Sequence, residues 1–131
     1  MLKTSVTKAF HFEAAHNLPN YDGDCSHLHG HSYKLEVTVG GPNITESDEM
    51  GCGNMVIDFK QLKRKVDYFI IEELDHKYLN EVLPGVPTAE FMCAWIYERL
   101  SNPRIGDLKG IKRIRLWETA DSFAEVEVIG E

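Results

Sequence analysis

The order of strand-like and helical patterns along this chain is the feature that most limits what it can fold into. The clearest pattern lies at residues 30–39, where apolar and polar side chains alternate as in a strand with one buried face. Residues 3–15 alternate in part, and residues 111–118 and 123–129 indicate two more strands. Two strands are therefore expected near each end of the chain.

Between these pairs of strands lie two segments whose apolar side chains recur at helical spacing. Asp58 is a candidate N-cap for the first helix, which should end near Leu74. Thr88 should cap the second helix, residues 89–101, which ends at an Asn-Pro pair because proline cannot continue a helix. The order β-β-α-α-β-β predicts an α+β fold, with one four-stranded antiparallel sheet and both helices on a single face. Open strand edges would favour assembly with further copies of the chain.

Length and charge restrict the class of protein. A chain of 131 residues favours a single domain, residues 1–131. Its net charge of −7 argues against a nucleic-acid partner, which needs a concentrated basic face. We expect no membrane span and no signal peptide, because no long apolar segment is visible. The cysteines, Cys25, Cys52 and Cys93, form no CxxC pair, so a cytoplasmic location with free thiols is expected.

A cluster of histidines follows Cys25, in the sequence Cys-Ser-His-Leu-His-Gly-His. His29 and His31 are two residues apart, so on a strand both imidazoles point to the same face. His16 ends the first predicted strand and comes close to them if the first two strands form a hairpin. Three neutral imidazoles suit Zn²⁺ and leave a fourth position open for water or substrate.

Spacing alone leaves other interpretations of this cluster open. His27 shares the phase of His29 and is a rival third ligand, and His11 is a weaker one. Cys25 could complete a tetrahedral site that is purely structural. The histidines could also lie at the sheet edge without any metal. The sequence shows no obvious glutamate dedicated to activating a metal-bound water, which counts against a zinc hydrolase.

Six short motifs occur in order over nearly the whole chain. They are Phe12-Glu-Ala-Ala-His16, Cys25-x-x-x-His29-Gly-His31, Val56-Ile-Asp-Phe59, Leu74-Asp-His-Lys-Tyr-Leu-Asn80, Pro87-Thr-Ala-Glu90 and Glu118-Thr119. Together they resemble the family of 6-pyruvoyl-tetrahydropterin and 6-carboxytetrahydropterin synthases. The resemblance implies the tunnelling fold (T-fold), in which three subunits close a barrel, two trimers stack into a hexamer, and active sites are shared between subunits. It also implies His16, His29 and His31 as the zinc ligands, in preference to His27.

The same resemblance implies roles for the remaining motif residues. Cys25 would act as a general base, because a nearby dication favours its thiolate. Asp75 and His76 would form a second proton relay, since a carboxylate sets the tautomer of an imidazole. Glu118 would anchor the pterin by accepting its paired N–H donors, with help from Thr119.

The spacing of the Cys-His motif carries information about the substrate and product. Three residues separate Cys25 from His29, which resembles the queuosine-pathway enzymes. The expected reaction converts 7,8-dihydroneopterin triphosphate to 6-carboxy-5,6,7,8-tetrahydropterin, releasing acetaldehyde and triphosphate. The alternatives are 6-pyruvoyl-tetrahydropterin synthase activity and a non-catalytic, zinc-stabilised binding domain.

The triphosphate needs local cations in an acidic chain, and the sequence does not rank the candidates His27, Lys34 and Arg115. The chain departs from the family at connection 40–54, which looks longer than in compact members. The resemblance therefore says least about how substrate reaches the active site.

Overall fold

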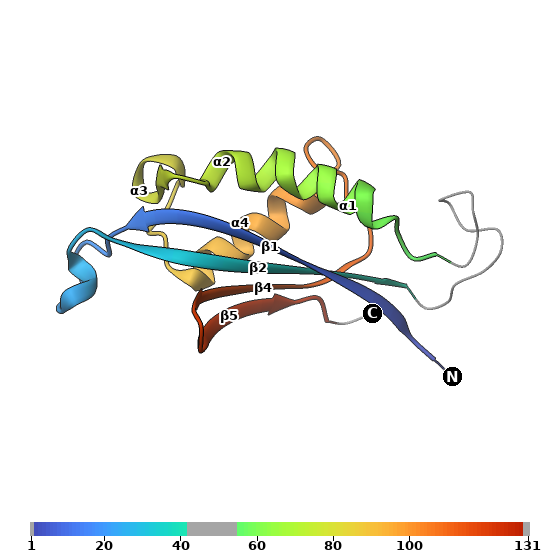
Figure 1. Cartoon of the computed structure of the whole chain (residues 1–131), viewed down its shortest axis with the longest axis horizontal. Helices are drawn as coiled ribbons and strands as arrows, with labels where there is room; N and C mark the ends of the chain where they lie inside the picture. The colour runs from blue at the N-terminus through green and yellow to red at the C-terminus, as the bar shows by residue number, and fades with distance from the viewer. Residues whose placement is uncertain (1, 42–54, 130–131) are drawn as a thin grey trace.

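The computed structural model describes residues 2–41 and 55–129 (Figure 1). Most of the predicted connection at 40–54, including Cys52, lies outside these residues. A single sheet forms one layer, and the helices lie together on one side of it (Figure 1). The predicted α+β arrangement is therefore confirmed.

The predicted strands pair in the expected antiparallel manner. β1 (Thr4–His16) and β2 (His29–Gly41) form a long hairpin, β4 (Ile111–Thr119) lies beside β2, and β5 (Ser122–Glu127) lies beside β4. The sheet contains one more strand than predicted, because β3 (Lys77–Tyr78) pairs parallel to β1. Two residues give no periodicity to detect, so this strand could not be expected from the sequence.

The first predicted helix ends at Leu74 as expected, but it is not a uniform α-helix. It begins with α1 (Phe59–Val66), passes through a π-helical segment (Asp67–Ile71) and ends with α2 (Glu72–Leu74). The Asp58 side chain caps its start by accepting the N–H of Lys60 at 2.9 Å.

The second predicted helix is α4 (Ala89–Ser101), whose bounds match the expectation. Its N-cap is the predicted one, since the Thr88 hydroxyl accepts the N–H of Phe91 at 3.1 Å. Two shorter helices were not predicted: a 3₁₀ turn at Asp24–Ser26 and α3 (Leu79–Val82).

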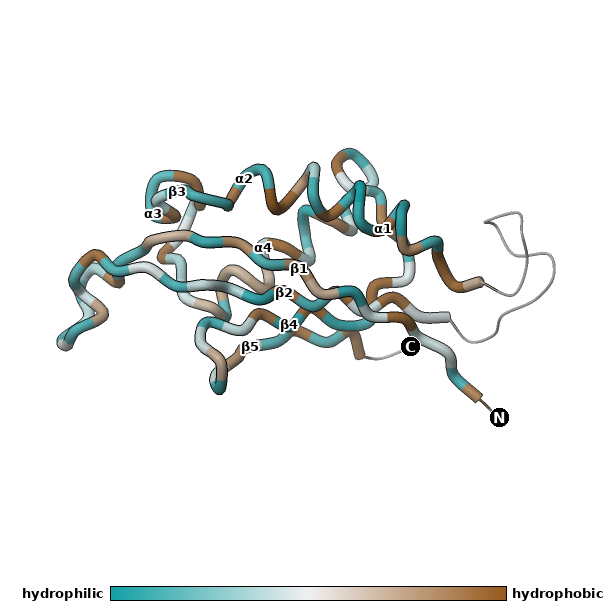
Figure 2. Tube along the Cα trace, in the orientation of Figure 1, coloured by the Kyte–Doolittle hydropathy of each residue, from teal (hydrophilic) through white to brown (hydrophobic). Residues whose placement is uncertain are grey.

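The core lies between the sheet and the helices. Alternate residues of β1 and β2, such as Phe10, Phe12, Leu35 and Val37, are buried there, and the hydropathy of both strands alternates along the chain (Figure 2). The helix-free face of the sheet is more polar. Within the described residues, no helix is long and apolar enough to cross a bilayer.

Candidate metal centre and active site

The hairpin of β1 and β2 brings three predicted ligands together at one end of the sheet. His16 pairs directly with His29 in the antiparallel register. The ring centroids of His16, His29 and His31 are 4.6 to 5.0 Å apart. One ligand atom from each ring lies within 4.8 Å of the other two. All three imidazoles are on the core-facing side of the strands, as the two-residue period predicts.

Backbone carbonyls fix the proton positions of two of these rings. His16 Nδ1 lies 2.8 Å from the carbonyl oxygen of Pro87, and His29 Nδ1 lies 2.7 Å from that of His27. A carbonyl can only accept, so each Nδ1 carries the proton and each Nε2 keeps its lone pair. The two Nε2 atoms are 3.1 Å apart. Two lone pairs at this distance repel unless a cation lies between them, and such outer bonds are typical of metal-ligating histidines.

His31 supplies the second sign of a metal site. Its Nε2 is buried and is the one buried side-chain nitrogen or oxygen without a hydrogen-bond partner in the described part of the chain. Burial lowers the pKa of His31, against the opposing effect of Glu118, and His16 and His29 lower it further. The neutral imidazole that a metal requires is therefore favoured.

Tyr33 lies beside two of the three imidazoles. Its ring centroid lies 5.5 Å from that of His31 and 6.3 Å from that of His16, and the ring stacks on Phe12 at 4.9 Å. Burial and the charge of Glu118 raise the pKa of the Tyr33 hydroxyl above its ordinary value, so it stays protonated. No role was predicted for this side chain, although its position two residues after His31 places it on the same face of the strand.

Glu118, the predicted anchor for the pterin, lies beside the three histidines. Its two carboxylate oxygens are each 3.8 Å from an imidazole nitrogen, one from His16 Nε2 and the other from His31 Nε2. Thr119 is exposed, and its hydroxyl donates to Asp121 at 3.0 Å within the β4–β5 turn. Glu118 therefore faces the histidines, whereas the Thr119 hydroxyl faces the β4–β5 turn.

The other candidate ligands lie outside the histidine group. Cys25 is half-buried in the 3₁₀ turn. Among the described residues, only the three histidines come together as a possible metal-binding group, and neither Cys25, His27 nor His11 belongs to it. His27 and His11 are exposed, and His27 contributes its backbone carbonyl instead of its ring.

Asp75 and His76 form a contact pair that is anchored to β1. An Asp75 oxygen lies 3.0 Å from His76 Nδ1, and the other accepts the backbone N–H of Glu13 at 2.9 Å. The backbone N–H of His76 in turn donates to the carbonyl of Glu13. The bond from Glu13 lowers the pKa of Asp75, outweighing desolvation, and His76 adds to the effect. The predicted pair is therefore a real contact, not two neighbours that point apart.

A surface pocket of about 510 Å³ lies between residue His76 of this pair and His31 of the histidine group. Its lining includes His31 and His76, together with Glu13, Lys77 and Tyr78. The pocket thus contains one predicted metal ligand and one predicted acid–base residue. Lys77 was not singled out as a cation, although it directly follows His76 in the sequence.

Two of the three candidate cations for the triphosphate, Arg115 and Lys34, contact acidic side chains of the chain itself. Arg115 Nε lies 2.8 Å from a Glu125 oxygen, and its Nη1 lies 3.8 Å from Glu36. Lys34 lies 3.8 Å from another Glu36 oxygen. Neither lines the pocket beside His31 and His76.

Comparisons with known proteins identify the family of the chain. The family model described as 6-pyruvoyl tetrahydropterin synthase matches residues 5–128. A Synechocystis sp. relative, named 6-carboxy-5,6,7,8-tetrahydropterin synthase, is 39% identical over 91% of this chain and 89% of its own. A Pyrococcus furiosus relative, named dihydroneopterin monophosphate aldolase, is 36% identical over 96% of this chain and 99% of its own.

A solved structure shares the fold. The Caenorhabditis elegans 6-pyruvoyl tetrahydropterin synthase superimposes with a TM-score of 0.79 over 98% of both chains, at 21% identity. The predicted T-fold is therefore confirmed for the subunit. With a family match over almost its whole length, three converging imidazoles and the ordered motifs around them, the chain belongs to the 6-pyruvoyl tetrahydropterin synthase family.

Proposed function

We propose that this chain is a zinc-dependent carbon–carbon lyase that converts 7,8-dihydroneopterin triphosphate and water to 6-carboxy-5,6,7,8-tetrahydropterin, a queuosine precursor, with release of acetaldehyde and triphosphate. The name of the 39%-identical relative supports this reaction. The spacing between Cys25 and His29 supports the same branch of the family. The observation that carries the proposal is the convergence of three imidazole nitrogens beside the carboxylate of Glu118.

The spacing of two of the three donors suits zinc. Two imidazole nitrogens bound to a tetrahedral Zn²⁺ at about 2.0–2.1 Å are roughly 3.3–3.4 Å apart. The Nε2 atoms of His16 and His29 are 3.1 Å apart, close to that spacing. Three protein ligands leave one position for substrate, where a bound Zn²⁺ would polarise the hydroxyls of the side chain.

The proton transfers fall to residues of the protein. Cys25, as the proposed base, takes a proton from a carbon of the substrate side chain. At the second relay, the contact of Asp75 with His76 Nδ1 holds the proton on that nitrogen, because an ionised carboxylate can only accept. His76 Nε2 is then the atom that exchanges a proton with substrate.

Glu118 remains our proposed anchor for the pterin, and its distance from the histidines limits where the pterin could lie. Each of its oxygens lies 3.8 Å from a ligand nitrogen, so any donor it accepts from must approach the metal closely. His27 and Thr119 are proposed as minor contacts to substrate. Because the Thr119 hydroxyl is used by Asp121, its amide is the better candidate donor.

Product analysis tests this proposal. Zinc-loaded protein incubated with 7,8-dihydroneopterin triphosphate should release acetaldehyde and triphosphate in equal amounts. Cys25→Ala should abolish turnover while the fold and stoichiometric zinc are retained, with His29→Ala as the matched variant that loses zinc. A pyruvoyl product without acetaldehyde would assign the sibling synthase activity. Zinc loss from Cys25→Ala would instead identify a structural four-ligand site.

A second candidate activity rests on the Pyrococcus furiosus relative, which bears the name of an aldolase for dihydroneopterin monophosphate. The same protein preparation should therefore be given the monophosphate in parallel. Faster turnover of the monophosphate, without acetaldehyde, would favour the aldolase over the carboxy-forming reaction.

A further inference from the structure

Asn17, the residue after the metal ligand His16, has a hydrogen-bond partner for each of its four polar groups. Its backbone N–H donates to Asn80 Oδ1 at 3.0 Å, and its backbone carbonyl accepts from Asn80 Nδ2 at 2.9 Å. Its side-chain oxygen accepts from the Tyr78 hydroxyl at 2.6 Å. Its side-chain NH₂ donates to the carbonyl of Ser26 at 3.3 Å. Three segments distant in sequence therefore meet at one residue.

The two backbone bonds extend the sheet. β3 pairs with β1 at Ala14 and Ala15, and the Asn80 carboxamide then binds the main chain of Asn17 as another strand residue would. These two bonds do not require an asparagine at position 17. They hold the end of β1, and with it His16, whatever side chain follows.

The side chain of Asn17 serves a different segment. It binds Ser26, the neighbour of Cys25, while the backbone N–H of Leu18 donates to the carbonyl of Cys25 at 2.7 Å. Together these bonds close the base of the connection between β1 and β2, which lies at the same end of the molecule as α3 (Figure 1). Tyr78 holds the carboxamide from the other side.

We propose that Asn17 is a positioning residue that fixes the Cys25 segment relative to the metal ligand His16 and to the segment after His76. The inference rests on the proposed function only for its catalytic readout. A base that is displaced by about 1 Å can lose up to 100-fold in rate, so a single carboxamide at this junction affects turnover.

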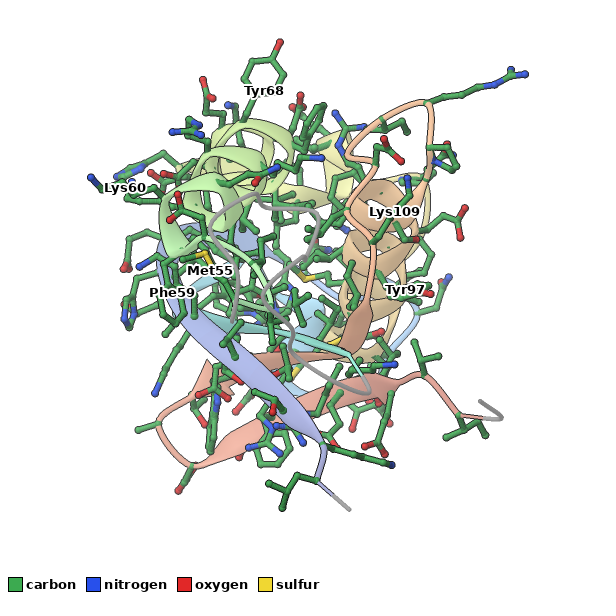
Figure 3. All side chains as sticks on the ribbon, turned by 90° about the vertical axis from the view of Figure 1, so that its right-hand side faces the viewer. Met55, Phe59, Lys60, Tyr68, Tyr97 and Lys109 are labelled. Atoms are coloured by element: carbon green, nitrogen blue, oxygen red, sulfur yellow. The ribbon has the colours of Figure 1, made fainter. Side chains whose placement is uncertain are left out.

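Two variants test this role with matched controls. Asn17→Ala removes both side-chain bonds and keeps both backbone bonds to Asn80. Tyr78→Phe removes one hydroxyl and leaves the rest of the junction. Tyr68→Phe is the control for the tyrosine, because Tyr68 is 65% exposed and projects away from the body of the protein (Figure 3). Asn20→Gly is the control for the asparagine, since it lies in the same connection and its φ of 70° suits glycine.

The readouts separate positioning from folding. In zinc-loaded protein, the rate of Cys25 alkylation by iodoacetamide is followed by peptide mass spectrometry, alongside zinc content, kcat and KM. We expect Asn17→Ala to alkylate several-fold faster, because half-buried Cys25 gains access to solvent, and to lose about 10-fold or more in kcat with little change in KM. Zinc content should stay at the wild-type level. Tyr78→Phe should also raise the alkylation rate and lower kcat, but by less than Asn17→Ala does. The two control variants should behave as wild type.

Unchanged alkylation in both variants would overturn the proposal. So would zinc loss in Tyr78→Phe, because the junction would then hold His16 and not the cysteine segment. If wild-type protein turns over neither pterin, the proposed function fails, yet the alkylation rates and zinc contents still decide whether Asn17 positions Cys25.

Discussion

His76 has a left-handed backbone conformation, with φ of 62°. For a residue with a Cβ atom this conformation costs on the order of 1–3 kcal/mol and persists only where the surroundings determine it. Here those surroundings are Asp75 and the backbone of Glu13, which hold both the main chain and the imidazole. Strain of this kind is common at catalytic residues. The contacts with Asp75 and Glu13 explain how the His76 side chain, although 78% exposed, keeps a defined position at the pocket.

The lowered pKa of Asp75 gives a prediction for stability against pH. The bond from the Glu13 N–H, aided by His76, holds this pKa below the ordinary value of 3.8. A carboxyl of this kind stabilises the folded state above its unfolded pKa, and the contribution is lost as pH falls through the folded pKa. Urea unfolding of metal-free protein between about pH 5 and pH 2 should therefore show a smaller loss of stability in Asp75→Asn than in wild type. Parallel curves would contradict this expectation.

Sequence patterns predicted that the three histidines come together, although spacing alone left rival ligands open and did not reveal what surrounds the group. The two-residue period of a strand fixes the shared face of His29 and His31, and a hairpin brings in His16. Glu118 reaches them only through the register of β4 on β2, where the preceding Trp117 pairs with Lys34. No local pattern specifies that register, so the acidic neighbour of the metal site became visible only in the structure.

At the scale of elements, the start of α4 contributes directly to the metal centre. Thr88 caps the helix, and the preceding Pro87 carbonyl accepts the proton of His16 Nδ1. The turn that begins the helix therefore also orients a ligand.

We expect Thr88→Ala to have two linked effects. Loss of the cap should lower the free energy of unfolding by about 1 kcal/mol. Displacement of the Pro87 carbonyl should also weaken metal binding, by up to about 10-fold, as for other outer partners of ligating histidines. Urea denaturation of metal-free protein and a chelator competition measure the two effects. Thr88→Ser keeps the hydroxyl and should match wild type, and unchanged affinity in Thr88→Ala would contradict the coupling.

The limits of the helix between Asp58 and Leu74 could be predicted from the sequence, but its internal irregularity could not. Its limits follow from the capping aspartate and the apolar spacing, but its π-helical segment does not. Within that segment the carbonyl of Phe69 accepts from Arg99 Nε of α4 at 2.7 Å. The irregularity has a tertiary partner from a distant part of the chain, which helical periodicity cannot reveal.

At the scale of the whole molecule, the sheet is covered on one face only (Figure 1). The other face carries partly exposed aromatic and charged side chains such as Trp117, Phe123 and Arg115. Together with the open edge of β5, this surface supports the proposal that copies of the chain assemble through their sheets.

Sedimentation velocity at micromolar concentration tests the proposed assembly. We expect a trimer or a hexamer, because barrel closure joins subunits in threes in the proposed arrangement. Phe123→Glu places a charge on β5 beside Glu125 and should shift the distribution towards smaller species. Tyr68→Glu, on the exposed helix surface, should leave it unchanged. A wild-type monomer would exclude active sites shared between subunits.

The three imidazoles lie where the two longest strands of the sheet meet the connection between them. An ion bound there would tie β1 to β2 at the end where a hairpin would otherwise fray. The ion would therefore stabilise the fold as well as take part in the reaction. The free energy of folding and metal occupancy would then be linked. A shortage of the ion would loosen the connection between β1 and β2, which carries the Cys25 thiol.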